Sequence, residues 1–145
     1  MTKYIYLFVF IVLFTNCQQK KQKVTIVQEV PTNFDMYKTS EMADLMRTML
    51  AKNKELKHKI EQNKSIGAFD SIYYGIHTAQ LTDSTDLDAT YSTFANHFLK
   101  MQQDIFEVAS EKQEQQFNAM VDACIACHKD RCTGPIPRIE KLRIK

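Results

Sequence analysis

A strict apolar repeat between residues 86 and 109 constrains the fold more than any other feature of the chain. Its apolar side chains alternate at spacings of four and three: Leu87, Tyr91, Phe94, Phe98, Met101, Ile105 and Val108. This spacing puts all of them on one helix face and is typical of an antiparallel helical bundle. The 145 residues include only three glycines and three prolines, which favours long uninterrupted helices.

Two further helices are predicted before this one. The first covers 40–63, with Ser40 as its N-cap, and its bundle-facing side chains are Met42, Met46, Met49, Asn53, Leu56 and Ile60. The second covers 69–81, and its apolar side chains are Phe69, Ile72, Tyr73, Ile76 and Ala79.

A fourth helix is predicted to begin at the capping sequence Ser110-Glu111-Lys112-Gln113 and to end near Gly134-Pro135. One of its faces carries Phe117, Met120, Val121, Cys124, Cys127 and His128. The expected fold class is therefore all-α, an antiparallel four-helix bundle over residues 39–132. A tail, residues 133–145, follows, and we expect its Ile136, Ile139 and Leu142 to pack against the domain.

Residues 1–17 have the pattern of an export signal of the lipoprotein type. Lys3 is the positive charge, the apolar run extends over 4–14, and Phe14-Thr15-Asn16-Cys17 resembles a lipobox with Phe14 and Asn16 as departures. Cys17 would then be lipidated, whereas the alternative is an uncleaved membrane anchor. Residues 18–38 form a tether. Both interpretations place the domain in a bacterial cell envelope, facing the periplasm and attached to a membrane.

The run Cys124-Ile125-Ala126-Cys127-His128 is a C-x-x-C-H sequence, the attachment signature of a c-type haem. Offsets of three and four residues put both thiols and the imidazole on one helix face. The run predicts one covalently bound haem c, held by thioether bonds to Cys124 and Cys127, with His128 as the proximal iron ligand. The other ring nitrogen of His128 needs an acceptor that the sequence does not identify.

Cys132 leaves a second interpretation open. Together with Cys124, Cys127 and His128 it supplies four ligands of the kind that a structural zinc site uses. A buried dithiol beside an unrelated histidine is a further alternative. If haem takes the first two cysteines, Cys132 has no partner within the domain and is either an inert buried thiol or a site of intermolecular disulfide formation.

Helical segments followed by a C-terminal C-x-x-C-H resemble the class II cytochromes c, the cytochrome c-prime family. The resemblance covers residues 40–131 and implies a four-helix bundle with the haem on the last helix. Leu45-Met46-Arg47 looks like the L-M-K run that carries the sixth iron ligand in low-spin members, which implies that role for Met46. Two features depart from the family: Cys132 stands where an arginine or lysine is usual, and the chain continues through 134–137.

Several side chains have a plain alternative role. Met46 is either an iron ligand or a filler of the core, and Met42 and Met49 lie one turn away on the same face. The aromatic residues Tyr73, Tyr91, Phe94 and Phe98 either wall the haem pocket or belong to a simple core. We expect three further histidines at the surface: His58, His77 and His97.

These patterns predict a membrane-tethered monohaem cytochrome that carries single electrons between redox partner proteins. No acid–base pair, nucleophile or substrate motif is recognisable, so we expect no enzymatic activity. The net charge of +2, with lysines spread among glutamates, argues against nucleic-acid binding. The alternative is a five-coordinate haem protein that binds NO or CO. Family members often dimerise through the first two helices, so a homodimer is a further expectation.

Overall fold

The computed structural model describes residues 38–145, and this part of the chain contains helices and loops but no strand. The all-α class is therefore confirmed. The predicted signal segment 1–17, with Cys17, and nearly all of the tether 18–38 lie outside the described residues. Among the helices that are described, none is both long and apolar enough to cross a bilayer.

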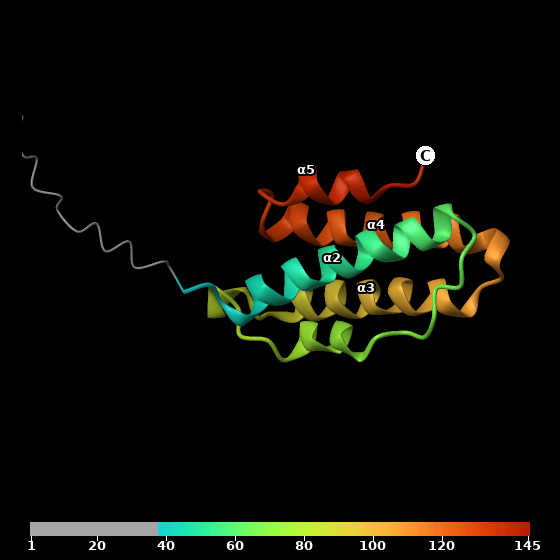
Figure 1. Cartoon of the computed structure of the whole chain (residues 1–145). Coiled ribbons are helices and arrows are strands. Elements are labelled where there is room, and N and C mark those ends of the chain that lie inside the picture. Colours follow the sequence, from blue (N-terminus) through green and yellow to red (C-terminus); the bar gives the residue numbers. More distant parts are fainter. Residues whose placement is uncertain (1–37) are drawn as a thin grey trace, which may run out of the picture. The chain divides into compact units, whose positions relative to one another are not determined.

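Three long helices form the body of the domain: α2 (Glu41–Glu61), α3 (Ala89–Glu107) and α4 (Ser110–Arg131) (Figure 1). Ser40 caps α2 as predicted, because its Oγ accepts a hydrogen bond of 3.1 Å from the Ala43 amide. The predicted capping box of α4 is wrong. Ala109 occupies the N-cap position without a side-chain hydrogen bond, and Ser110 is already the first helical residue.

The second predicted helix is shorter and of another type. Residues Ser71–His77 form a 3-10 helix, η1, capped by the Asp70 carboxylate. Gly75 and the aromatic and β-branched residues around it have low helix propensity, which explains the short segment. Gly75 also lets η1 approach α2, since a Cβ there would lie 3.2 Å from a Leu45 methyl. The predicted four-helix bundle is therefore three long helices and one short 3-10 segment.

The start of α3 differs from the prediction as well. A short 3-10 turn, η2 (Ser84–Asp86), precedes it, and the Asp88 carboxylate caps α3 by accepting a 2.7 Å hydrogen bond from the Tyr91 amide. Leu87 therefore lies outside the helix and is 64% exposed. Its predicted place on the apolar face is wrong, because Asp88 is the N-cap and Ala89 is the first residue of the helix.

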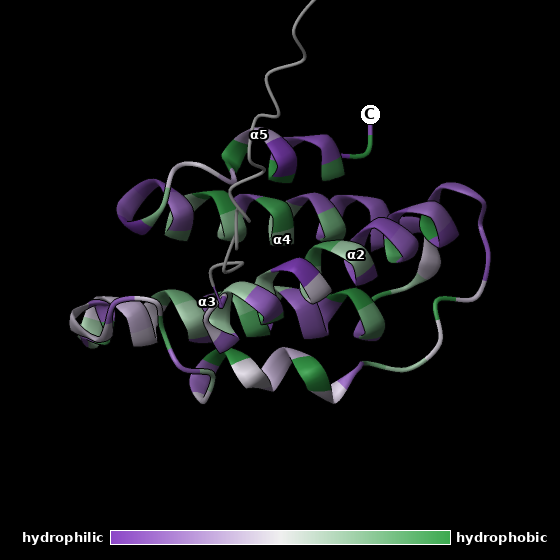
Figure 2. Cartoon of the chain, turned by 60° about the vertical axis from the view of Figure 1, so that its left-hand side comes forward, coloured by the Kyte–Doolittle hydropathy of each residue, from purple (hydrophilic) through white to green (hydrophobic). Residues whose placement is uncertain are grey.

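The chain continues past α4 in two short helices, α5 (Ile136–Ile139) and η3 (Glu140–Leu142). Figure 1 shows this segment folding back along α4. Ile139, Leu142 and Ile144 are buried, whereas Ile136 is only half-buried. Figure 2 shows the apolar side of α5 turned toward α4. We predicted that the helix with the C-x-x-C-H run is the last helix of the chain. That prediction is wrong, because α5 and η3 follow α4.

The most deeply buried large side chains belong to α3 and α4: Gln102, Ile105, Phe117, Met120 and Val121. Gln102 is the polar exception. Its amide nitrogen and oxygen find no hydrogen-bond partner within residues 38–145. An unpaired buried amide lowers stability, because the group gives up its hydrogen bonds to water on folding.

Replacing Gln102 by leucine should therefore raise the free energy of unfolding by about 1–2 kcal/mol, since it removes the unpaired amide at similar volume. Urea denaturation followed by circular dichroism measures the change. Gln103→Leu is the control: Gln103 donates a hydrogen bond to the Tyr74 hydroxyl at the surface, so its loss should not stabilise the protein. A destabilised Gln102→Leu variant would show that the amide is satisfied in solution.

Candidate functional site

The C-x-x-C-H side chains lie on the last two turns of α4, which continues to Arg131. Cys124, Cys127 and His128 are all half-buried, and none of the three described cysteines forms a disulfide. The helix thus brings the two thiols and the imidazole to one side of the bundle, in the arrangement that their spacing predicts.

Cys124 points toward a series of buried side-chain contacts that links three elements of the fold. Its Sγ lies 3.6 Å from the Met120 Sδ, which also accepts a long contact of 3.9 Å from the Asn53 amide. The Asn53 oxygen in turn accepts a 3.1 Å hydrogen bond from the Tyr73 hydroxyl. These contacts connect α4 to α2 and η1 next to Cys124, the first cysteine of the motif.

Burial raises the pKa of both motif thiols. It raises the pKa of Cys124 to about 12, with a further contribution from the neighbouring Cys127. Burial also raises the pKa of Cys127, and the Arg131 guanidinium opposes that rise. Thiolate is the reactive form of cysteine, so the packed domain lowers the reactivity of both sulfurs, and of Cys124 most.

The His128 ring has one nitrogen engaged and one available. Its Nδ1 lies 3.0 Å from the backbone oxygen of Cys132. A carbonyl only accepts hydrogen bonds, so Nδ1 carries the proton and the lone pair of a neutral ring is on Nε2. This is the tautomer that a metal ligand needs, and the Cys132 carbonyl is the acceptor that the sequence did not identify.

Arg131 fixes the end of α4 to the start of α3. Its guanidinium lies 2.5 Å from the Asp88 carboxylate and donates to the backbone oxygen of Asp86 at 3.2 Å. The Arg131 hydrogen bond lowers the pKa of Asp88, which also caps α3. This contact was not predicted from the sequence. The available signal was the pair of aspartates, Asp86 and Asp88, in the first turn of the helix predicted over 86–109.

Met46 lies at the same height along the bundle as the motif. Asn53 and Met120 are in contact across the antiparallel pair α2 and α4. Seven residues back from Asn53 is Met46, and seven residues forward from Met120 is Cys127, about 10 Å along each helix. Met46 is half-buried against the core.

The other candidates from the sequence fall into two groups. Met42, Met49, Tyr73, Tyr91 and Phe98 are buried core residues, whereas Phe94 is half-buried. His58, His77 and His97 are exposed, as we expected for surface histidines.

The arrangement does not favour the zinc alternative. Within residues 38–145, no three side chains among His, Cys, Asp and Glu are placed to hold a metal ion. Cys132, the fourth zinc ligand proposed from the sequence, is exposed at the C-cap of α4, whereas Cys124 faces the interior.

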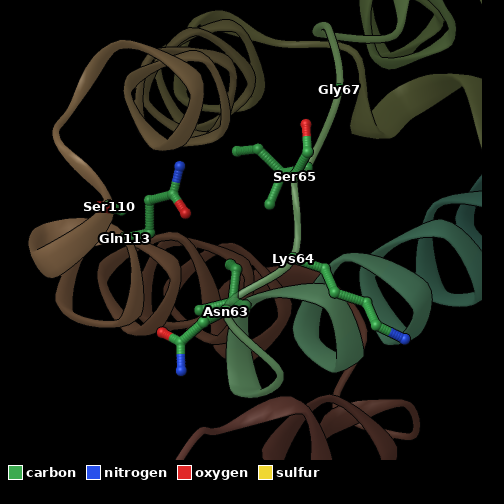
Figure 3. Close-up of a pocket in the computed structure, with 8 residues that line it drawn as sticks. Asn63, Lys64, Ser65, Gly67, Ser110 and Gln113 are labelled. Atoms are coloured by element: carbon green, nitrogen blue, oxygen red, sulfur yellow. The ribbon is translucent and has the colours of Figure 1, made fainter.

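A hollow of about 320 Å³ lies at the opposite end of the bundle. Figure 3 shows its walls, which come from the end of α2, the loop after it, and Ser110 and Gln113 of α4. Ser110 is fourteen residues from Cys124, about 21 Å along the helix. This hollow is therefore separate from the C-x-x-C-H side chains.

The chain matches no family model, no curated protein and no solved structure in the three comparisons made with known proteins. A function is therefore inferred from the residues and their geometry.

Alkylation should distinguish the three described cysteines in the haem-free protein. A short pulse of maleimide should modify exposed Cys132 first, Cys127 more slowly and Cys124 last, as measured by mass spectrometry of the peptides. With a pKa of about 12, Cys124 is thiolate in only about one molecule in a thousand at pH 9. Denaturation in urea should abolish the differences. Equal rates in the folded protein would contradict the burial of Cys124.

Proposed function

We propose that the protein is a membrane-tethered monohaem c-type cytochrome that carries single electrons between redox partner proteins. The observation that carries the proposal is the state of the C-x-x-C-H side chains. Two unpaired thiols and an imidazole lie on one helix side, and the imidazole nitrogen that faces away from Cys132 is free to bind a metal.

The residues present fit a haem as a set of donors. Cys124 and Cys127 would each add S–H across a vinyl group, so that sulfur bonds to one carbon and hydrogen to the other. His128 Nε2 would bind the iron, and the Met46 thioether is the candidate for a second protein ligand. When bound, haem iron supplies a one-electron redox change, and the protein sets its ligands and its exposure to solvent.

The burial of Cys124 implies an order of events. Its sulfur is enclosed beside Met120 and Tyr73, and its high pKa makes it unreactive in the packed domain. We therefore propose that haem attachment precedes the final packing of η1 and α2 against α4.

The location follows from the sequence outside the described residues. The export signal and Cys17 support a lipid-anchored protein in the bacterial envelope, facing the periplasm. We propose no enzymatic activity, because the side chains of the site are ligands and attachment points. A homodimer through the first two helices is part of the family resemblance and is open to a measurement of mass in solution.

Expression of the full chain in a host that matures c-type haems tests the central proposal. We expect a Soret band and a pyridine haemochrome spectrum typical of two thioether bonds. The double variant Cys124→Ser, Cys127→Ser should lose covalent haem, and Cys132→Ser should retain it. A wild-type protein without haem, in a host that matures a control cytochrome, would overturn the proposal.

Met46→Leu separates electron transfer from gas binding, because it removes the sulfur at similar volume. If Met46 is the sixth ligand, the wild-type ferrous spectrum should be unaffected by CO and that of Met46→Leu should shift. Met42→Leu and Met49→Leu are the controls, and a shift in one of them would assign the ligand there. A wild-type spectrum that already shifts with CO would favour the five-coordinate, NO- or CO-binding alternative.

A further inference from the structure

The carbonyl that holds His128 belongs to the residue at which the chain leaves α4. Cys132 is the C-cap, with φ −150° and ψ 86°, so its peptide has turned out of the helical path. Its N–H donates to the backbone oxygen of His128 at 3.0 Å, while its own oxygen lies 3.0 Å from the His128 ring. Continued helix would direct this oxygen along the helix axis, away from the ring.

The direction of the chain after Cys132 is fixed by a short, internally bonded turn. The Ile136 amide donates to the Thr133 oxygen at 3.0 Å, and the Ile139 amide donates to the Pro135 oxygen at 3.1 Å. Pro135 and Pro137 restrict the backbone further. The carbonyl of Cys132 can therefore keep its orientation as long as the following residues stay docked.

The C-terminal segment, residues 133–145, is docked at its far end by polar contacts. Asn118 of α4 holds the Ile144 backbone on both sides, with two hydrogen bonds of 3.0 Å. Lys57 of α2 donates to the backbone oxygens of Arg143 at 2.7 Å and Lys141 at 3.2 Å. Arg143 also pairs with Asp122 at 2.5 Å.

Apolar burial supports these ties. Ile139, Leu142 and Ile144 are 7%, 3% and 8% exposed, so the segment covers the outer side of α4 as part of the core. Undocking it would expose these three side chains and release the chain that directs the Cys132 carbonyl.

We propose that the C-terminal segment is a positioning element for His128. By docking on α4 and α2, it holds the Cys132 carbonyl against Nδ1, which selects the Nδ1–H tautomer and presents Nε2 for coordination. The purpose of this device depends on the haem function proposed above, but the tautomer itself is a property of the haem-free chain.

The test uses the full chain without haem, labelled with ¹⁵N-histidine. His128→Gln assigns the His128 signals among the four histidines. We expect the wild-type ring in the Nδ1–H form. Asn118→Ala and Leu142→Ala should shift the ratio of tautomers toward Nε2–H by about tenfold, the effect of losing one hydrogen bond. Arg138→Ala is the matched control, because Arg138 is exposed in α5 and its side chain makes no bond within the described residues.

Circular dichroism checks that the three long helices remain. Should Asn118→Ala unfold the domain, Lys57→Met removes a different tie and carries the same expectation. Wild-type Nε2–H, or an unchanged ratio in folded variants with an undocked segment, would overturn the proposal. A chain that binds no haem but shows the expected tautomers would instead overturn only the haem function.

Discussion

The antiparallel contact between α3 and α4 is the interaction on which the other parts of the domain depend. Its side chains include the most deeply buried of the described residues, among them Ile105, Phe117 and Val121. Arg131 joins the same two helices where α4 ends and α3 begins, because it bonds to Asp88, the residue that caps α3. The position of the C-x-x-C-H side chains is therefore set by one pair of helices, and the remaining elements cover it.

The elements that cover this pair are of two kinds. α2 and η1 pack on the interior side, where Tyr73, Asn53 and Met120 form the series of buried side-chain contacts next to Cys124. The C-terminal segment packs on the outer side and meets α2 through Lys57. The thiols thus face a packed interior while the ring of His128 is held from the end of the helix. Different contacts therefore hold the cysteines and the histidine of the motif.

The long helices were predictable from sequence because periodicity and capping agree there. Ser40 precedes the apolar face of α2 as an N-cap, and the predicted face of α3 is correct at Tyr91, Phe98 and Ile105. The second helix is shorter than predicted, and Gly75 within it packs closely against Leu45, a residue distant in sequence. Leu87 was misplaced because the periodic pattern runs past the point at which Asp88 caps the helix.

Some features of the site were also predictable from the sequence, and others were not. The three motif side chains were predictable, since helical spacing alone puts them together. The acceptor for His128 was not, because it is a backbone oxygen whose orientation depends on how residues 133–145 fold back. Arg131 and its aspartates were missed for a related reason. Their pairing joins residues 43 positions apart, and neither apolar periodicity nor a local motif reports such a contact.

The docking of residues 133–145 also affects the order in which the fold can form. Lys57 bonds to residues 84 and 86 positions further along the chain, and Asn118 bonds to Ile144. These contacts cannot form on a nascent chain until residues 141–144 have left the ribosome, whereas the helices before them can form earlier. Completion of the histidine environment thus follows the formation of the three long helices. A chain that ended before Lys141 would retain the motif cysteines but lack the hydrogen bonds that hold the segment after α4.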